Sequence, residues 1–239
     1  MKILVVGGGG REHAIVWKIA QSPKVDKIYC APGNGGIAEL AECVDIAATD
    51  IENMVKFAKD NAIDLVMVAP DDPLVLGMVD AMEKEGIRAF GPRANAAIIE
   101  GSKAFSKELM KKYNIPTANY EVFTDSTSAI DYIKAQNTFP TVIKADGLAL
   151  GKGVIIAQNL EEAEQAVHEM IDDGKFGKSG SRVVIEEFLT GPEVSVLAFT
   201  DGKTVKPMVS AQDHKRAYDN DEGLNTGGMG TFSPSRLYD

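Results

Sequence analysis

The chain has 239 residues, a length that suits one large domain or two smaller ones. Its 35 acidic and 25 basic residues give a formal net charge of -10 at pH 7, which argues against general binding to nucleic acid or to an anionic membrane. Hydrophobic residues make up 44% of the sequence, enough for a sizeable core. Two cysteines cannot form a disulfide framework, and the apolar run at the N-terminus is too short for a signal peptide or a membrane span. We therefore expect a cytoplasmic protein.

The first 92 residues alternate between short apolar strands and helical segments. Apolar runs that are typical of buried strands occur at residues 3–6, 27–31, 64–69 and 87–90. Helical patterns occur between them, at residues 11–21, 50–59 and 74–84. Strands that alternate with helices in this way predict a doubly wound parallel sheet, and hence an α/β fold.

The rest of the chain begins with a helical stretch over residues 94–113, interrupted at Gly101-Ser102. Further strands are expected at residues 120–123, 141–144, 154–157 and 182–188, with helices at 126–136 and 160–171. Alternating apolar residues predict an antiparallel pair within residues 194–209. Residues 212–235 are polar and glycine-rich and predict a long loop without regular structure, of the kind that is usually functional or disordered.

The first glycine-rich loop, Gly7 to His13, lies where a strand leads into a helix. Backbone N–H groups at a helix N-terminus bind anions, and glycine lets a phosphate approach closely. Glu12 or His13 stands where the dinucleotide fingerprint needs a third small residue, so a nicotinamide-binding domain is disfavoured. Arg11 indicates instead a single phosphate held by amides and a guanidinium. A surface ion pair of Arg11 at the start of the helix is the alternative.

A second glycine-rich segment, Gly147 to Gly153, is one residue short of a Walker A loop and has no Ser or Thr after Lys152. A strand that ends at Lys144, a glycine-rich turn and a returning strand predict a lid over phosphates, mobile without nucleotide, with a plain hairpin as the alternative. Further along, an apolar strand ends in Glu186 and Glu187. The edge of such a strand can bind adenine through backbone groups, and a carboxylate beyond the turn can bind ribose hydroxyls.

These elements together resemble the ATP-grasp superfamily. The matching motifs are GSKAF with Lys103, VIKADG with Lys144, the GKGV turn, VIEEFL, and Glu193-x-Ser195. Four further motifs make the chain similar to the phosphoribosylamine–glycine ligase (glycinamide ribonucleotide synthetase) family of purine biosynthesis: GGGGREHA, APGNGG, QDHKR and NTGGMG. The resemblance covers the whole chain, and the last two motifs are the most specific.

The resemblance implies an ATP site. In it, Lys103 and Lys144 would bind the phosphates, together with the glycine-rich turn at Gly151, Lys152 and Gly153. The adenine hinge of the family falls on Glu186, Glu187 and Leu189, and its ribose-binding acid falls on Glu193.

The resemblance also implies sites for the other reactants. Gly9, Gly10 and Arg11 lie in the loop expected near the phosphate of 5-phosphoribosylamine, with Gly33 and Asn34 nearby. Asp213, Lys215 and Arg216 match catalytic positions that line the joint substrate and triphosphate site. The same site would include the substrate-binding residues Asn225, Thr226, Gly227, Gly228, Met229 and Gly230.

The implied enzyme is an ATP-dependent C–N ligase. ATP would phosphorylate the carboxylate of glycine to glycyl phosphate, and the amine of 5-phosphoribosylamine would then attack it to form the amide. Catalysis of this kind is mainly positioning and charge neutralisation, which suits lysines, arginines and glycine loops. Two alternatives stay open: another ATP-grasp carboxylate–amine ligase, and a non-catalytic nucleotide-binding fragment.

The family resemblance also gives a domain organisation. It implies an N-terminal α/β substrate-binding domain over residues 1–100, an ATP-grasp lid subdomain over residues 101–190, and the incomplete start of a second ATP-grasp subdomain over residues 191–239. The cofactors implied are ATP and Mg²⁺ (or Mn²⁺). Because the family's metal-binding motif lies beyond the position of Asp239, no metal ligand is assigned here, and we expect residues 1–239 alone to bind nucleotide weakly.

Overall fold

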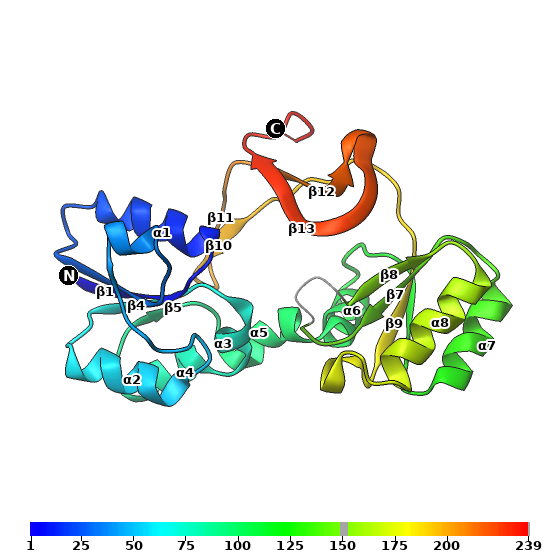
Figure 1. Ribbon diagram of the computed structural model, residues 1–239, viewed down its shortest axis with the longest axis horizontal. Coiled ribbons are helices and arrows are strands. Elements are labelled where there is room, and N and C mark those ends of the chain that lie inside the picture. The colour runs from blue at the N-terminus through cyan, green and yellow to red at the C-terminus, as the bar shows by residue number, and fades with distance from the viewer. Residues whose placement is uncertain (149–152, 239) are drawn as a thin grey trace.

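A five-stranded parallel sheet forms the N-terminal part of this computed structural model, which describes residues 1–148 and 153–238 (Figure 1). The strands run in the order β3-β2-β1-β4-β5. Their bounds are β1 Lys2–Gly7, β2 Lys27–Pro32, β3 Glu42–Cys43, β4 Leu65–Val68 and β5 Ala89–Phe90. The central strand β1 pairs with β2 on one side and β4 on the other, so the predicted doubly wound α/β sheet is confirmed.

Helices cover both faces of this sheet. Their bounds are α1 Gly10–Ala20, η1 Ile37–Glu39, α2 Ile51–Asp60, α3 Asp71–Val75, α4 Met78–Lys84 and α5 Ala94–Gly101. Leu4 of β1 packs in a core with Met54 and Met82 from α2 and α4, whereas its neighbour Val5 packs with Val16 of α1 on the opposite face. Since successive side chains of a strand point to opposite faces, the part of a strand that is covered on both sides must be apolar, as residues 3–6 of β1 are.

The helix expected over residues 74–84 is wrong in its extent. Two short helices, α3 and α4, take its place, and the first begins at Asp71. The break falls at Gly77, whose φ of +90° lies in the left-handed region that only glycine adopts readily. The apolar spacing alone did not reveal this interruption.

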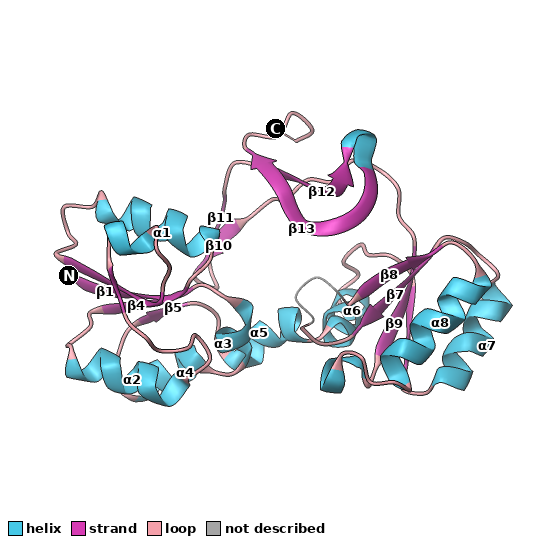
Figure 2. Cartoon of the chain, in the orientation of Figure 1, coloured by secondary structure: helices cyan, strands magenta, loops and turns pink. Residues whose placement is uncertain are grey.

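The middle of the chain forms a four-stranded antiparallel sheet with strand order β6-β9-β7-β8 (Figure 2). It follows the helix α6 Lys103–Lys112 and consists of β6 Tyr120–Phe123, β7 Thr141–Ala145, β8 Val154–Ala157 and β9 Val183–Glu187. The helices α7 Ser126–Gln136 and α8 Leu160–Ile171 pack against one face, with Ile143 and Ile185 in the shared core, and η2 spans Gly177–Gly180. The elements expected here are confirmed within a residue or two.

The last part of the chain contains two hairpins. The predicted antiparallel pair is β10 Ala198–Thr200 with β11 Val205–Pro207. The long unstructured loop expected over residues 212–235 is wrong, because β12 Gln212–Tyr218 and β13 Glu222–Phe232 form a hairpin there, joined by η3 Asp219–Asp221. Most of its residues are exposed or half-buried. The strands therefore lack the alternation of buried and exposed apolar residues by which strands are recognised in a sequence, as far as the described side chains show.

No helix within residues 1–148 and 153–238 is both long and apolar enough to cross a membrane. In Figure 1 the hairpin of β12 and β13 lies between the N-terminal sheet and the four-stranded sheet. The β10–β11 segment exposes Leu197, Phe199 and Val205, each with more than half of its surface accessible.

The sheet core gives a test of the fold. Leu4 is fully buried, so replacing it with alanine (Leu4→Ala) leaves a cavity and should lower the free energy of unfolding by about 2–5 kcal/mol. The matched control is Leu76→Ala, because Leu76 is 58% exposed. Urea unfolding followed by circular dichroism measures both variants, and equal losses would contradict this packing.

Candidate functional site

The two glycine-rich loops of the parallel sheet lie side by side where β1 and β2 end. The Gly33 N–H donates to the Gly7 carbonyl at 3.0 Å, and Asn34 Nδ2 donates to the Gly8 carbonyl at 2.8 Å. Gly33 has a φ of +72°, and a Cβ on Gly8 would lie 2.6 Å from the Gly33 carbonyl oxygen. The contact therefore requires glycine at both positions, and it places residues 9–11 beside the second loop, as expected.

The start of α1 offers backbone donors and a cation. Gly9 caps the helix, Gly10 is its first residue, and the side chain of Arg11 is exposed without an ion-pair partner among the described residues. The surface pair considered for Arg11 is therefore not present there. Glu12 is 5% exposed and accepts a hydrogen bond from the Gly9 N–H at 2.6 Å. This leaves the next N–H groups of the helix and the guanidinium for an anion.

Lys103 lies at the first residue of α6, where this helix meets the end of β7. Its Nζ donates to the Gly147 carbonyl at 3.0 Å. Burial lowers the pKa of Lys103; the Asp146 carboxylate opposes this shift, and the nearby Lys144 ammonium adds to it. The two predicted phosphate lysines are thus close enough for the charge of one to affect the pKa of the other.

Asp146 joins the start of α6 to the sheet. Its side chain is buried and accepts hydrogen bonds from the Ala104 N–H at 2.7 Å, Ser102 Oγ at 3.1 Å and Arg182 Nε at 2.9 Å. The Ser102 hydroxyl also caps α6 by accepting from the Phe105 N–H at 3.1 Å. The position of Lys103 thus depends on a carboxylate that the sequence did not single out.

Lys144 and Glu186 meet on the sheet face opposite α7 and α8. Lys144 is on β7 and Glu186 is directly diagonal to it on β9, and both side chains alternate with the core residues Ile143 and Ile185. The Lys144 Nζ lies 2.9 Å from Glu186 Oε2. A third residue, Lys107 of α6, places its Nζ 3.0 Å from the same oxygen. One buried carboxylate oxygen therefore holds two ammonium groups.

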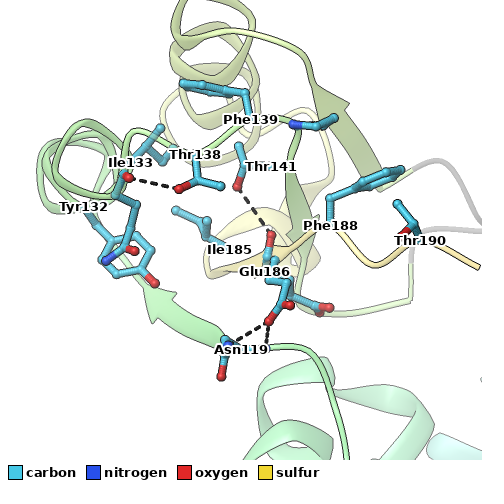
Figure 3. Close-up of a pocket in the computed structure, with 13 residues that line it drawn as sticks. Asn119, Tyr132, Ile133, Thr138, Phe139, Thr141, Ile185, Glu186, Phe188 and Thr190 are labelled. Carbon is cyan, nitrogen blue, oxygen red and sulfur yellow. Dashed lines mark hydrogen bonds between the residues drawn. The ribbon is translucent and has the colours of Figure 1, made fainter.

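The other hinge residues do not join this cluster. Glu187 accepts hydrogen bonds from the backbone N–H and Nδ2 of Asn119, and Leu189 is 62% exposed. Glu187 lines a cavity of about 470 Å³ at the end of the sheet, with Tyr132 of α7 and Phe139 on its walls (Figure 3). Glu186 also lines that cavity, whereas none of the three lysines does.

The predicted lid turn is only partly covered by the structure. Gly151 and Lys152 lie outside the described residues, and so does the middle of the segment for which mobility was expected. Gly153 is described: its carbonyl accepts a hydrogen bond from the Ala145 N–H at 2.8 Å, which continues the β7–β8 pairing.

The β12–β13 hairpin carries the predicted catalytic residues. Lys215 forms an ion pair with Glu193 and lies 3.7 Å from Asp213 Oδ2. The bond to Glu193 raises the pKa of Lys215. Arg216 Nη1 donates to the Gly223 carbonyl at 2.7 Å. Glu193, the ribose-binding acid implied by the resemblance, is therefore bonded to the hairpin through Lys215.

The glycine-rich part of β13 lies against β12. Arg216 is in register with Asn225, and Thr226 Oγ1 donates to the Lys215 carbonyl at 2.8 Å and accepts from the Gly228 N–H at 3.1 Å. The structure therefore brings the predicted substrate-binding segment alongside Lys215 and Arg216. The segment consists of Asn225, Thr226, Gly227, Gly228, Met229 and Gly230.

Lys107, Asp146, Arg182 and Glu12 were not predicted as site residues. Only Lys107 had a local signal, since it follows Lys103 by four residues and so shares its side of the helix. Within the described part of the chain, no group of three or more His, Cys, Asp or Glu side chains could hold a metal ion.

Comparisons with known proteins agree over the whole chain. Residues 1–100 match the family model "Phosphoribosylglycinamide synthetase, N domain", and residues 101–238 match its "ATP-grasp (A) domain". A phosphoribosylamine–glycine ligase of Halalkalibacterium halodurans is 56% identical over 234 residues, covering 98% of this chain and 54% of that protein. Its counterpart in Haemophilus influenzae is 55% identical over 237 residues, covering 98% and 55%.

A solved structure is also similar. The crystal structure of phosphoribosylamine–glycine ligase from Thermotoga maritima matches with a TM-score of 0.83 and 32% identity, covering 100% of this chain and 56% of that one. The chain therefore spans about half the length of the curated relatives and of the solved structure that it matches.

The Asp146 network gives a second test. Asp146→Ala removes a carboxylate that accepts hydrogen bonds from three residues, and it should lower the free energy of unfolding by about 2–4 kcal/mol, since Arg182 is partly exposed and its share is screened. Asp60→Ala, at an exposed position at the end of α2, is the control. Chemical denaturation measures both, and an Asp146 variant as stable as the control would show that the network does not anchor α6.

Proposed function

This chain belongs to the phosphoribosylglycinamide synthetase family, and from that premise we propose that it forms the N-terminal and nucleotide-binding part of an ATP-dependent ligase. The reaction would join glycine to 5-phosphoribosylamine through a glycyl phosphate intermediate, in purine biosynthesis. Glycine and 5-phosphoribosylamine are thus the proposed partners, and a cytoplasmic setting is part of the proposal. The name of these relatives, phosphoribosylamine–glycine ligase, supports this substrate pair.

The observation that carries the proposal is the cluster of Lys103, Lys144 and buried Glu186 beside the strand end at residues 186–189. Two ammonium groups can offset part of the charge of a triphosphate, and the segment that follows β9 would offer its backbone groups to a purine base. In this proposal Lys144 exchanges its bond with Glu186 for one with the nucleotide phosphates. Magnesium that accompanies ATP would supply further charge neutralisation.

The paired glycine loops would hold the phosphate of 5-phosphoribosylamine. The Gly10 and Arg11 N–H groups lie at the positive end of α1, and the free guanidinium of Arg11 can form a charge-assisted bond. Gly33 and Asn34 close the other side of this loop pair. A phosphate bound there would fix the ribosyl amine at the carboxyl edge of the sheet, where ligands of such sheets bind.

The hairpin residues Asp213, Lys215 and Arg216 would line the place of phosphoryl transfer. Attack of a glycine carboxylate oxygen on the γ-phosphorus brings anions together and expels ADP. The amine nitrogen then attacks the acyl carbon and expels inorganic phosphate. Cations on a rigid strand stabilise the charge that develops in both steps. Glu193, which pairs with Lys215 here, would bind the ribose of ATP.

We keep the division into residues 1–100, 101–190 and 191–239 as part of the proposal. It is supported by the separate cores of the two sheets and by the two hairpins that follow them. In this division the first unit binds the phosphoribosyl substrate, and the second and third enclose ATP.

The function is tested by turnover in a chain of the relatives' length. Residues 1–239 are joined to the matching remainder of the H. halodurans relative, and ADP release is measured with Mg-ATP, glycine and freshly generated 5-phosphoribosylamine. The proposal expects ADP release only when both substrates are present. Release with a different amine would favour another ATP-grasp ligase, and no release by a folded chimera whose parent relative is active would favour a non-catalytic fragment.

Arg11→Ala should weaken binding of the phosphoribosyl substrate by about 1.5–3 kcal/mol, because one charge-assisted hydrogen bond is lost. ATP binding should stay close to that of the wild type. Calorimetric titration with ribose 5-phosphate, a stable stand-in, measures the first effect, and Lys18→Ala on the same helix is the control. Equal weakening of both ligands would overturn the assignment of this loop.

Binding of ATP should depend on pH through Lys103. Its lowered pKa means that the ammonium loses its proton at a lower pH than an ordinary lysine, and the triphosphate binds the charged form. Affinity should therefore fall as pH rises toward the ordinary lysine range, whereas Lys103→Arg should hold its affinity over the same range. Parallel pH profiles of the two proteins would contradict this role.

A further inference from the structure

Lys107 lies in the nucleotide-binding region without being available to bind phosphate. Its side chain is 11% exposed, and the ammonium has three acceptors: Glu186 Oε2 at 3.0 Å, Thr117 Oγ1 at 2.7 Å and the Ala118 carbonyl at 3.4 Å. It also lies 5.6 Å from the centre of the Tyr120 ring. An ammonium has three protons, so all of its donors are used within the protein. Lys107 therefore differs from Lys103 and Lys144.

Glu186 is held unevenly by its partners. The residue is 5% exposed, and Lys107 and Lys144 both lie at Oε2. Its other oxygen, Oε1, is buried and has no hydrogen-bond partner among the described residues. Buried polar atoms of native proteins are nearly always paired, because an unpaired one loses its solvation without compensation. Oε1 of Glu186, at the end of β9, is therefore available to a hydrogen-bond donor that lies outside the described residues.

We infer that Lys107 is a positioning residue that holds Glu186 by Oε2 and so keeps Oε1 as an acceptor for the amino group of a 6-aminopurine. The inference rests on the proposed nucleotide site. When Lys144 turns to the phosphates, Lys107 is the cation that remains on Oε2. The carboxylate then keeps its orientation through the binding event.

The consequence is discrimination between purine bases. A carboxylate only accepts hydrogen bonds, so it pairs with the N–H of a 6-amino group and repels the carbonyl oxygen of a 6-oxopurine. Sites built around a specific hydrogen bond reject the ligand that cannot form it more strongly than apolar pockets do. Lys107 therefore controls the choice between ATP and ITP, which differ at this edge of the base.

The test is the ratio of the affinities for ATP and ITP, measured by calorimetric titration of the whole chain. The wild type is expected to prefer ATP by about tenfold or more. Lys107→Met should reduce this ratio by about tenfold, and Lys107→Arg should retain most of it because it keeps a cation at Oε2. Lys111→Met, at an exposed lysine of the same helix, is the matched control and should leave the ratio unchanged.

A merely structural lysine would weaken both nucleotides equally and leave the ratio as it is, and that result would overturn the inference. Should Lys107→Met fail to fold, Thr117→Val removes one anchor of the ammonium and should move the ratio in the same direction by a smaller factor. Glu186→Gln should raise ITP relative to ATP, since an amide can donate to the 6-oxo group. If the wild type binds no purine nucleotide, the proposed site itself is refuted. An unchanged ratio, by contrast, refutes only the role of Lys107.

Discussion

The buried Asp146 carboxylate is the contact on which the candidate nucleotide site depends. It joins the first turn of α6, through Ser102 and Ala104, to Arg182 at the start of β9. Helix α6 carries Lys103 and the sheet carries Lys144, so the separation of these two cations is set by this junction. Charges that must meet a triphosphate need such a fixed frame, because positioning rather than proton transfer drives phosphoryl transfer.

The same frame separates two tasks among three neighbouring lysines. In the proposed site Lys103 and Lys144 would bind phosphate, whereas Lys107 donates its hydrogen bonds to Glu186, Thr117 and Ala118. Burial makes this division possible, since a dehydrated ammonium is costly unless all of its protons are paired. In the proposed site, helix α6 would thus supply both a phosphate ligand, Lys103, and a support for Glu186, Lys107.

Much of this arrangement could be read from the sequence, and the rest could not for physical reasons. The apolar strands of both sheets were found because burial on one or both faces leaves a pattern in the chain. The Asp146–Arg182 contact joins residues far apart in sequence and leaves no such pattern. The hairpin over residues 212–232 was missed because its strands are exposed, so pairing there comes from the backbone. The motif carrying Lys215 and Arg216 was recognised, but its strand was not.

The most direct test of the central claim is to find where a nucleotide binds. Residues 1–239 are irradiated with 8-azido-ATP, with and without excess ATP, and the labelled peptides are identified by mass spectrometry. The account predicts label on the end of β9 and the segment after it, residues 183–193, and its loss when ATP competes. Label confined to the cavity residues 132–140, or to the glycine loops of the parallel sheet, would contradict a nucleotide site beside Lys103, Lys144 and Glu186.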